Sequence, residues 1–284
     1  MTAGNRSEIE RILREAGDSE PELDSRILTE ELEEEALDEA VRRRASGEPL
    51  AYILGHRHFY REDYKVRPGV LIPRADSELL VESALQYLGQ LEMALGDVAK
   101  IKSEVISGTI RFADLCTGTG CIGISVSNEL IRKNLDVSGV LTDISDTAVI
   151  TAEENVTSCS LKPEILKVIR HDILTEELDG EYDLIVSNPP YITDAEMLEL
   201  DREVSDYEPH LALEAGQDGM DFYKVILKKS YAALSSGGAV MVEHGDLQGE
   251  SVRRLFEEAG FKGIITLKDY CGNDRVTAGF KYAG

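Results

Sequence analysis

The fold is decided at residues 110–123, where the sequence reads IRFADLCTGTGCIG. Residues 110–115 have the apolar pattern of a buried strand, and they run into a glycine turn followed by an apolar helical pattern. Glycine allows the chain to turn sharply and its backbone to approach a ligand closely. The spacing Gly118-x-Gly120-x-x-Gly123 also matches the G-x-G-x-x-G pattern of a dinucleotide-binding turn. Glycine-rich turns between strand and helix are common, however. The turn therefore indicates a ligand site without specifying the ligand.

Strand and helix patterns alternate on both sides of this turn. Segments that favour strands are 110–115, 139–142, 165–169, 184–187, 239–243 and 276–282. Such alternation predicts an α/β domain whose mostly parallel sheet is covered by helices on both faces. Ligands of these sheets bind beyond the carboxyl ends of the strands. We therefore expect the functional motifs to lie at strand ends.

The segment that precedes this domain has a different pattern of apolar residues. Its first 55 residues carry apolar side chains at helical spacing in three short segments, which predicts a small helical domain. Aromatic and β-branched residues then predict a short hairpin, and Pro68-Gly69 predicts a turn before a helix over about 76–91. We expect three parts: a helical domain at 1–55, a hairpin linker at 56–75 and the α/β domain at 76–284.

Composition argues against several classes of function. The net charge is −24, from 30 basic and 54 acidic side chains, and a strongly acidic chain repels phosphate backbones, which disfavours direct nucleic-acid binding. No long apolar run or apolar leader is visible, so we expect neither a membrane span nor secretion. The cysteines and histidines show no metal-ligand spacing, so we expect no metal site and a reduced, cytoplasmic setting.

Carboxylates follow the second and third strand patterns. Asp143 is suited to accept hydrogen bonds from two ribose hydroxyls, a feature shared by enzymes that use nicotinamide or S-adenosylmethionine cofactors. Asp172 can accept from an adenine amino group while Ile173 packs on the ring. Either aspartate could instead cap the next helix, and this alternative is stronger for Asp172. We expect Asp114, at the entry to the glycine turn, to contact the cofactor's amino group only indirectly.

The fourth strand pattern, residues 183–187, runs straight into Asn188-Pro189-Pro190-Tyr191. Two prolines hold the backbone extended and remove two N–H donors, while their carbonyl oxygens stay available as acceptors. The Asn188 side-chain oxygen and the Pro189 carbonyl can each accept one hydrogen of a substrate NH2 group. Tyr191 offers a flat wall for a planar amide or base. The alternative, a chance turn, does not account for the position of this tetrapeptide after the fourth strand.

This arrangement suits methylation of an amide nitrogen. Such a nitrogen is a poor nucleophile because its lone pair is delocalised into the carbonyl group. Two acceptors that hold both hydrogens out of line favour a pyramidal nitrogen and aim its lone pair at a sulfonium methyl group. Positioning of this kind can lower a barrier by several kcal/mol, and no general base is needed before attack.

The tetrapeptide NPPY resembles the signature of amino-methylating methyltransferases, which include adenine N6, guanine N2 and glutamine enzymes. Two flanking segments distinguish among them. Residues 44–82 read RASGEPLAYILGHRHFYREDYKVRPGVLIPRADSELLVE, and residues 203–223 read EVSDYEPHLALEAGQDGMDFY. Both are similar to blocks of the peptide chain release factor N(5)-glutamine methyltransferase family (PrmC/HemK). The resemblance extends from about residue 40 to the end of the chain.

The resemblance implies methyl transfer from S-adenosyl-L-methionine, with S-adenosyl-L-homocysteine as product. The acceptor is the glutamine of the Gly-Gly-Gln motif in class I release factors, so the reaction modulates translation termination. It also implies a seven-stranded Rossmann-like class I methyltransferase domain behind a helical substrate-docking domain and a hairpin linker. Implied substrate contacts are Asn188, Pro189, Pro190 and Tyr191, with Asn188, Pro189 and Tyr191 catalytic. Implied cofactor contacts are Cys116, Thr117, Gly118, Thr119, Gly120, Asp143, Asp172, Ile173 and Asn188.

This chain departs from the family pattern in three places. Cys116 stands where the glycine loop usually has glycine, so a side chain must fit near the cofactor. Ala75 replaces a proline in the segment 73–78, which changes local rigidity. The N-terminal helical region is shorter than usual, which affects how it docks the body of the release factor.

Three other functions compete with this interpretation. An adenine N6 or guanine N2 methyltransferase acting on nucleic acid would explain NPPY equally well, but it predicts a basic groove, and the flanking blocks indicate the glutamine enzymes. A non-catalytic cofactor-binding scaffold would not need the acceptor pair at Asn188 and Pro189. A nicotinamide oxidoreductase would use the same glycine turn but would leave NPPY unexplained.

Overall fold

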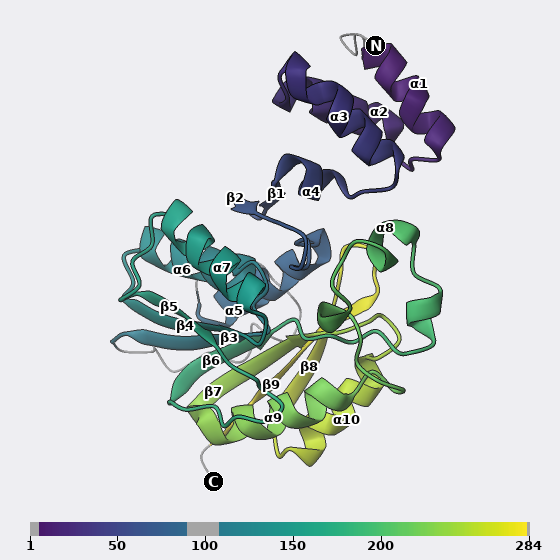
Figure 1. Cartoon of the computed structure of the whole chain (residues 1–284). Helices are drawn as coiled ribbons and strands as arrows, with labels where there is room; N and C mark the ends of the chain where they lie inside the picture. The colour runs from purple at the N-terminus through teal and green to yellow at the C-terminus, as the bar shows by residue number, and fades with distance from the viewer. Residues whose placement is uncertain (1–5, 90–107, 283–284) are drawn as a thin grey trace.

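A computed structural model describes residues 6–89 and 108–282 of the chain. Its centre is a seven-stranded sheet with the strand order β5-β4-β3-β6-β7-β9-β8 (Figure 1). The strands are β3 (Ile110–Leu115), β4 (Val137–Asp143), β5 (Leu166–Arg170), β6 (Tyr182–Ser187), β7 (Leu234–Glu243), β8 (Lys262–Lys268) and β9 (Asp274–Phe280). Strands β3 to β7 run parallel, and β9 is antiparallel to both of its neighbours. The predicted mostly parallel α/β sheet is confirmed.

The register of the sheet brings four strand ends to one edge. Leu115, the last residue of β3, pairs with Thr142 of β4 and with Ser187 of β6. Asp143, the last residue of β4, pairs with Arg170, the last residue of β5. The segments that follow these strands therefore start side by side, as the rule for parallel sheets predicts.

Helices cover both faces of the sheet. On one face lie α5 (Glu78–Tyr87), α6 (Cys121–Arg132) and α7 (Asp146–Ser158), and on the other lie α9 (Asp221–Ala233) and α10 (Gly249–Glu258) (Figure 1). Each pair of layers encloses its own apolar core. Fully buried members include Leu80, Ile124, Leu130 and Leu184 on the first face, and Ile185, Tyr223, Ile226 and Phe256 on the second. Strands buried on both faces explain the continuous apolar runs of the sequence.

Strand β8 and the exact ends of α5 differ from the sequence expectation. β8 was not predicted, because it lies at the sheet edge and most of its residues are only half-buried or exposed. Its apolar pattern is correspondingly weak. The helix expected over about 76–91 is α5 preceded by a 3-10 turn, η1 (Ala75–Ser77), and residues 90–91 lie outside the described part of the chain.

The N-terminal helices form a separate cluster. They are α1 (Arg6–Ala16), α2 (Pro21–Glu31) and α3 (Glu34–Ala45), followed by a short α4 (Leu50–Leu54). Their core contains Ile9, Leu13, Leu28, Leu37 and Val41. The buried Arg44 guanidinium lies 2.6 Å from Asp24 and 2.9 Å from Glu203, which belongs to α8 (Arg202–Ser205) of the sheet domain. This ion pair joins the helical part to a loop that flanks the carboxyl edge of the sheet. The domain boundaries at residues 55 and 75 stay a prediction.

The predicted hairpin consists of β1 (His56–Phe59) and β2 (Glu62–Lys65). It packs on the sheet domain through buried polar contacts. Tyr64 shares a hydrogen bond of 2.8 Å with Ser125 of α6. The fully buried Asn155 of α7 accepts from the Lys65 backbone N–H at 2.8 Å and donates to the Thr119 carbonyl at 2.9 Å. The hairpin is thereby fixed against the glycine turn.

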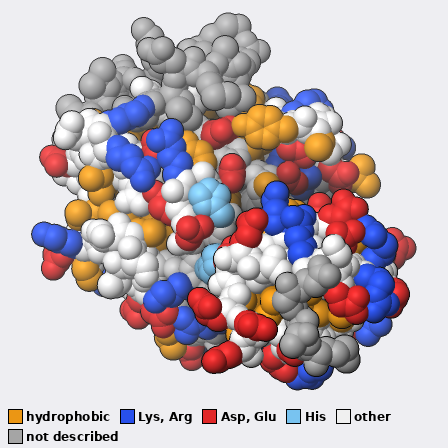
Figure 2. Space-filling model, turned by 90° about the horizontal axis from the view of Figure 1, so that it is seen from above, with side chains coloured by type: hydrophobic (Ala, Val, Ile, Leu, Met, Phe, Trp, Pro, Cys, Tyr) orange, Lys and Arg blue, Asp and Glu red, His pale blue; other side chains and the backbone are white. Residues whose placement is uncertain are grey.

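No helix of the described chain has the length and apolar character that crossing a membrane requires. The face shown in Figure 2 carries acidic side chains among its basic ones.

Gly123 permits close packing of α6 on β4, and its replacement tests this contact. A Cβ atom at this position would lie 2.2 Å from Leu141 Cδ2 and 3.1 Å from Asp114 Oδ2, so the fully buried Leu141 side chain would have to shift. We expect Gly123→Ala to lower the free energy of unfolding by about 1–3 kcal/mol, measured by urea denaturation. The control Ser127→Ala removes, from the same helix, a buried hydroxyl without a hydrogen-bond partner among the described residues. It should leave stability unchanged or raise it; equal stability of Gly123→Ala and wild type would contradict the packing argument.

Candidate functional site

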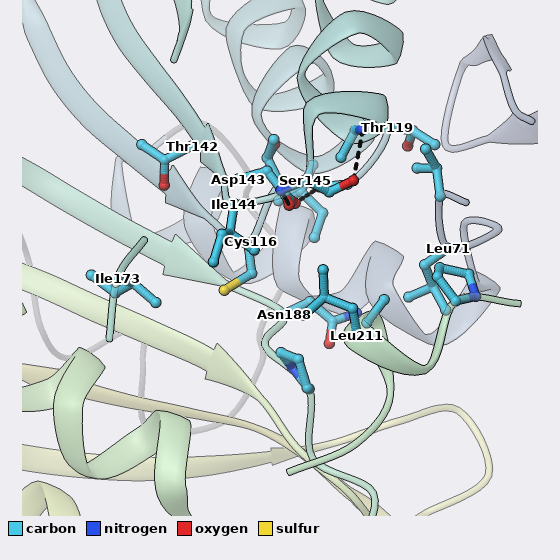
Figure 3. Close-up of a pocket in the computed structure, with 18 of the residues that line it drawn as sticks. Leu71, Cys116, Thr119, Thr142, Asp143, Ile144, Ser145, Ile173, Asn188 and Leu211 are labelled. Atoms are coloured by element: carbon cyan, nitrogen blue, oxygen red, sulfur yellow. Dashed lines mark hydrogen bonds between the residues drawn. The ribbon is translucent and has the colours of Figure 1, made fainter. Parts of the chain in front are cut away.

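The segments that follow β3 to β6 line a pocket that encloses about 1040 Å³ of empty space, part of it open to solvent (Figure 3). Motifs at four strand ends thus meet in one place, as expected. Of the predicted site residues, the pocket wall contains Cys116, Thr117, Gly118, Thr119, Asp143, Asp172, Ile173, Asn188 and Pro190. Gly120, Pro189 and Tyr191 are not part of the wall.

Asp114 anchors the glycine turn from below. Its fully buried Oδ2 accepts a hydrogen bond from the Thr117 hydroxyl at 2.6 Å and another from the Gly123 N–H at 3.0 Å. These two donors lie on either side of the turn, so one carboxylate fixes its entry and its exit. Oδ1 is buried without a partner among the described residues. Burial raises the pKa of Asp114 to about 7, although both hydrogen bonds oppose this shift.

Asp143 lies on the pocket wall beside the turn (Figure 3). Oδ2 accepts from the Gly118 N–H at 2.9 Å, and Oδ1 accepts from the Ser145 N–H at 2.9 Å. The cap of α7 is Ser145, whose hydroxyl oxygen accepts from the Ala148 N–H, so the capping alternative for Asp143 is wrong. Each carboxylate oxygen keeps a further lone pair for a ligand hydroxyl. Burial raises the pKa of Asp143.

Asp172 makes the local hydrogen bonds of a capping residue, but residues 173–176 form a turn and no helix lies between β5 and β6, so the capping alternative is not confirmed. Its oxygens accept from the Leu174 N–H at 2.9 Å and from the Thr175 hydroxyl at 2.7 Å, and it closes the turn after β5. The Thr175 hydrogen bond is the main cause that lowers the pKa of Asp172. Asp172 still borders the pocket, and the buried Ile173 lines it as expected.

The turn itself requires left-handed backbone at three positions. Cys116, Gly118 and Gly120 have φ angles of 59°, 58° and 82°. Gly120 faces away from the pocket, because a Cβ atom there would lie 3.0 Å from Ile124 and 3.2 Å from Leu141. Cys116 occupies the left-handed region with a side chain, which costs about 1–2 kcal/mol.

The Cys116 sulfur lies on the side of the pocket where Ile173 and Asn188 are found (Figure 3). Burial is the main cause that raises the pKa of its thiol. The side chain is therefore a neutral, apolar part of the pocket wall at neutral pH rather than a nucleophile.

The NPPY segment turns away from the sheet directly after β6. The half-buried Asn188 donates from Nδ2 to the Ser77 hydroxyl oxygen at 3.1 Å. Pro189 and Pro190 are buried. The Tyr191 ring packs against the apolar core on the α9 face, and its carbonyl accepts from Gln248 Nε2 at 2.8 Å. The tyrosine thus anchors the segment, and the flat wall expected of its ring is not seen.

Sequence reasoning did not single out the outer wall of the pocket. That wall consists of Val70, Leu71, Pro73 and Arg74 from the linker, Ser77 from η1, and Pro209, Leu211, Ala212 and Phe222 from the segment after NPPY. Both groups lie inside the two flanking blocks, 44–82 and 203–223, which were the available signal. The buried Glu208 joins the blocks, since its carboxylate pairs with Arg74 and accepts from the Ile72 N–H at 3.2 Å.

Glu243, the last residue of β7, was also missed. Its side chain is 1% exposed and lies behind Asn188 and Ser77. Within the described ranges, the structure contains no group of three or more His, Cys, Asp or Glu side chains that could hold a metal ion.

Two family models match the chain. The methyltransferase small domain matches residues 98–203, and the PrmC N-terminal domain matches residues 30–55. The release factor glutamine methyltransferase of Pasteurella multocida is 38% identical over 259 residues, which are 89% of this chain and 82% of that protein. The protein of the same name from Haemophilus influenzae is 37% identical over 242 residues, which are 84% and 77% of the two chains.

Among solved structures, a 16S rRNA methyltransferase of T. thermophilus in complex with AdoMet and guanosine is similar in fold. Its TM-score is 0.51 at 20% identity, and the match covers 80% of this chain and 49% of that chain. At this identity the likeness concerns the fold alone, and it confirms the predicted class I methyltransferase architecture.

The raised pKa of Asp114 predicts how stability depends on pH. Between about pH 4, where an unfolded aspartate ionises, and about pH 7, the folded protein holds a proton that the unfolded chain has released. The stability contributed by this proton is fully present below about pH 4 and is lost as the pH rises through about 7.

We expect the free energy of unfolding of wild type, minus that of Asp114→Asn, to fall across this window by on the order of a few kcal/mol. Urea denaturation at a series of pH values measures the difference, and all other titrating groups cancel in it. The asparagine keeps an oxygen acceptor but does not titrate. A difference that does not change with pH would show that Asp114 does not titrate in this range.

Proposed function

Since the chain belongs to the family of release factor glutamine methyltransferases, we propose that its substrate is the glutamine of the Gly-Gly-Gln motif in class I release factors. The reaction transfers the methyl group of S-adenosyl-L-methionine to the side-chain amide nitrogen of a release-factor glutamine. The observation that carries the proposal is Asn188, which presents a side-chain amide at the pocket beyond β6. The pocket fits this chemistry, because its inner part carries carboxylates and its outer part is apolar.

The inner part of the pocket suits S-adenosyl-L-methionine, which is the cofactor of this family. The free lone pairs of Asp143 would accept from the ribose hydroxyls, and Ile173 would pack against the adenine ring. Oδ1 of Asp114 has no partner among the described residues, and a cationic amino group nearby would favour the ionised form of this carboxyl group. The left-handed turn at Cys116–Gly120 brings backbone to the pocket edge. When bound, the cofactor supplies a methyl group on a positively charged sulfur.

The chain's own part in the reaction is to hold the acceptor amide. Asn188 Oδ1 and the Pro189 carbonyl would each accept one hydrogen of the glutamine NH2 group. The two prolines bring no N–H donor that would compete for these oxygens. Because both hydrogens are held, the nitrogen lone pair is directed out of the amide plane. The proton can leave after the methyl group is transferred, so the site needs no general base.

The outer wall suits a narrow peptide loop. Leu71 and Leu211 line the pocket away from Asp143 (Figure 3), and Phe222 also contributes to its wall. Two glycines before the glutamine would let a peptide backbone approach these side chains closely. Arg74 on the same wall is held by the buried Glu208, so this part of the wall is rigid.

The nucleic-acid alternative is not favoured. The relatives carry the name release factor glutamine methyltransferase, and the net charge of −24 opposes phosphate backbones. Acidic side chains also lie among the basic ones on the face in Figure 2.

We further propose that the helical part, residues 1–55, docks the body of the release factor, and that residues 56–75 and 76–284 are the linker and the catalytic domain. All four cysteines are free, which supports a reduced, cytoplasmic setting.

Transfer of a labelled methyl group tests the proposal directly. Incubation of the enzyme with methyl-labelled S-adenosylmethionine and a class I release factor should label the release factor. Mass spectrometry should place the methyl group on the glutamine of Gly-Gly-Gln. The matched control is a release factor with this glutamine changed to alanine, which should stay unlabelled. Label on RNA or DNA in place of protein would show that the acceptor is wrong.

Replacement of Asn188 tests its role as an acceptor. We expect Asn188→Ala to lower the rate of a single turnover by on the order of 100-fold, because one of the two hydrogens of the substrate amide is no longer held. Cofactor affinity, measured by calorimetry with S-adenosylhomocysteine, should be largely retained. An unchanged turnover rate would remove Asn188 from the mechanism, whereas complete loss of cofactor binding would assign it to the cofactor site alone.

A further inference from the structure

The NH2 group of Asn188 contacts a group of buried polar side chains at the edge of the pocket. Asn188 Nδ2 donates to the Ser77 hydroxyl oxygen at 3.1 Å, and Ser77 is 2% exposed. The Glu243 carboxyl group follows Val242, which pairs with Ser187 in the sheet, so it lies beside Asn188. Ser77 and Asn188 both lower the pKa of Glu243 as hydrogen-bond donors. Glu243 Oε2 is buried and has no partner among the described residues. A carboxylate in such a place is costly, so its position calls for a functional reason.

The chemistry of the three groups fixes the direction of the hydrogen bonds. An ionised carboxylate can only accept. The Ser77 hydroxyl must therefore donate its hydrogen to Glu243, and only its lone pairs remain for Asn188. The Asn188 side chain can form a hydrogen bond to these lone pairs, or to the carboxylate itself, only by donating from its NH2 group. Its oxygen is consequently turned away from Ser77 and Glu243 and stays free to accept a substrate hydrogen.

We propose that Glu243 is a positioning residue, which acts through Ser77 to hold the Asn188 amide with its oxygen toward the substrate. This inference rests on the proposed function, because the oxygen matters only if Asn188 accepts a substrate hydrogen. An asparagine without this restraint could turn over and present NH2 to the substrate NH2 group. Two donors would then face each other, and the acceptor pair would be lost. The buried carboxylate therefore selects one of two nearly isosteric orientations.

Ionisation of Glu243 is part of the argument, because a protonated carboxyl group can donate as well as accept. Burial raises the pKa of Glu243 to about 7, against the opposing effects of Ser77, Arg275 and Asn188. Asn188 is therefore oriented most strongly above this pH. Charged and titratable groups that face Glu243 from neighbouring elements are Asp76 of η1, Cys121 of α6, Tyr191 after β6, Tyr223 of α9 and Arg275 of β9.

The test compares Glu243→Gln with Asp183→Asn. Both changes convert a carboxylate to its amide, and Asp183 lies at the opposite end of the sheet, where it accepts from the Arg111 N–H at 2.8 Å. The measurements are the single-turnover rate of methyl transfer to a release factor, the affinity for S-adenosylhomocysteine, and the free energy of unfolding. A glutamine at 243 can donate to Ser77, which reverses the hydrogen-bond chain.

We expect Glu243→Gln to lower the single-turnover rate by about 100-fold, as misplaced catalytic groups do. Affinity for S-adenosylhomocysteine should stay within about threefold of wild type, because the cofactor side of the pocket is unchanged. The wild-type rate should also rise with pH through about 7, where Glu243 ionises, and Glu243→Gln should lack this rise. Asp183→Asn should keep both the rate and its pH dependence. A Glu243→Gln enzyme with the wild-type rate and pH profile would overturn the proposal.

The double variant Ser77→Ala/Glu243→Gln tests the route of the effect, and the pH dependence of the wild-type rate tests the proposal even if Glu243→Gln folds poorly. Without the Ser77 hydroxyl, the glutamine cannot reverse the chain, so the double variant should be no slower than Ser77→Ala alone. If the rate losses of Ser77→Ala and Glu243→Gln instead add up in the double variant, Glu243 does not act through Ser77. Failure of the proposed function is distinguishable, because wild type itself would then label no release factor. If wild type is active and Asn188→Ala is not, an active Glu243→Gln enzyme refutes the positioning role alone.

Discussion

The buried carboxylate of Asp114 is the constraint on which the site depends. One oxygen accepts from Thr117 at the entry of the glycine turn and from Gly123 in the helix that leaves it. The turn between β3 and α6 is therefore closed from inside the protein, and its outer edge is free to face a ligand. Gly123 must lack a side chain for the helix to come this close. Asp143 then holds the middle of the same turn through the Gly118 N–H.

Much of this could be predicted from the sequence, because parallel strands end at one edge of their sheet. Knowledge of that rule alone places Asp143, Asp172, Ile173 and Asn188 around one pocket, where the structure has them. The local role of a residue was harder to predict. Asp143 and Asp172 have the same position after a strand, but only the structure shows that Ser145 takes over the cap in one case and that Thr175 engages the aspartate in the other.

Residues that depend on contacts distant in sequence were not predictable. Ser77 and Glu243 carry no pattern that links them to Asn188, and they meet only because η1, β6 and β7 converge. Strand β8 was missed for a related reason, since an edge strand has half its surface exposed and little apolar signal. The flanking blocks were recognisable as sequence, yet their physical role appears only when Glu208 is seen to join them across the outer wall.

The hydrogen bond between Asn188 and Ser77 also has a consequence for how the chain folds. It joins positions 111 residues apart, and the Glu208 bond to the Ile72 N–H spans 136 residues. Contacts of such long sequence separation form late in folding, because the chain must first give up the entropy of closing large loops. The turn held by Asp114 joins residues only nine apart, so it closes at a smaller cost in chain entropy. A chain that has closed this turn but not the long loops would still lack the contact between Asn188 and Ser77 at its candidate site.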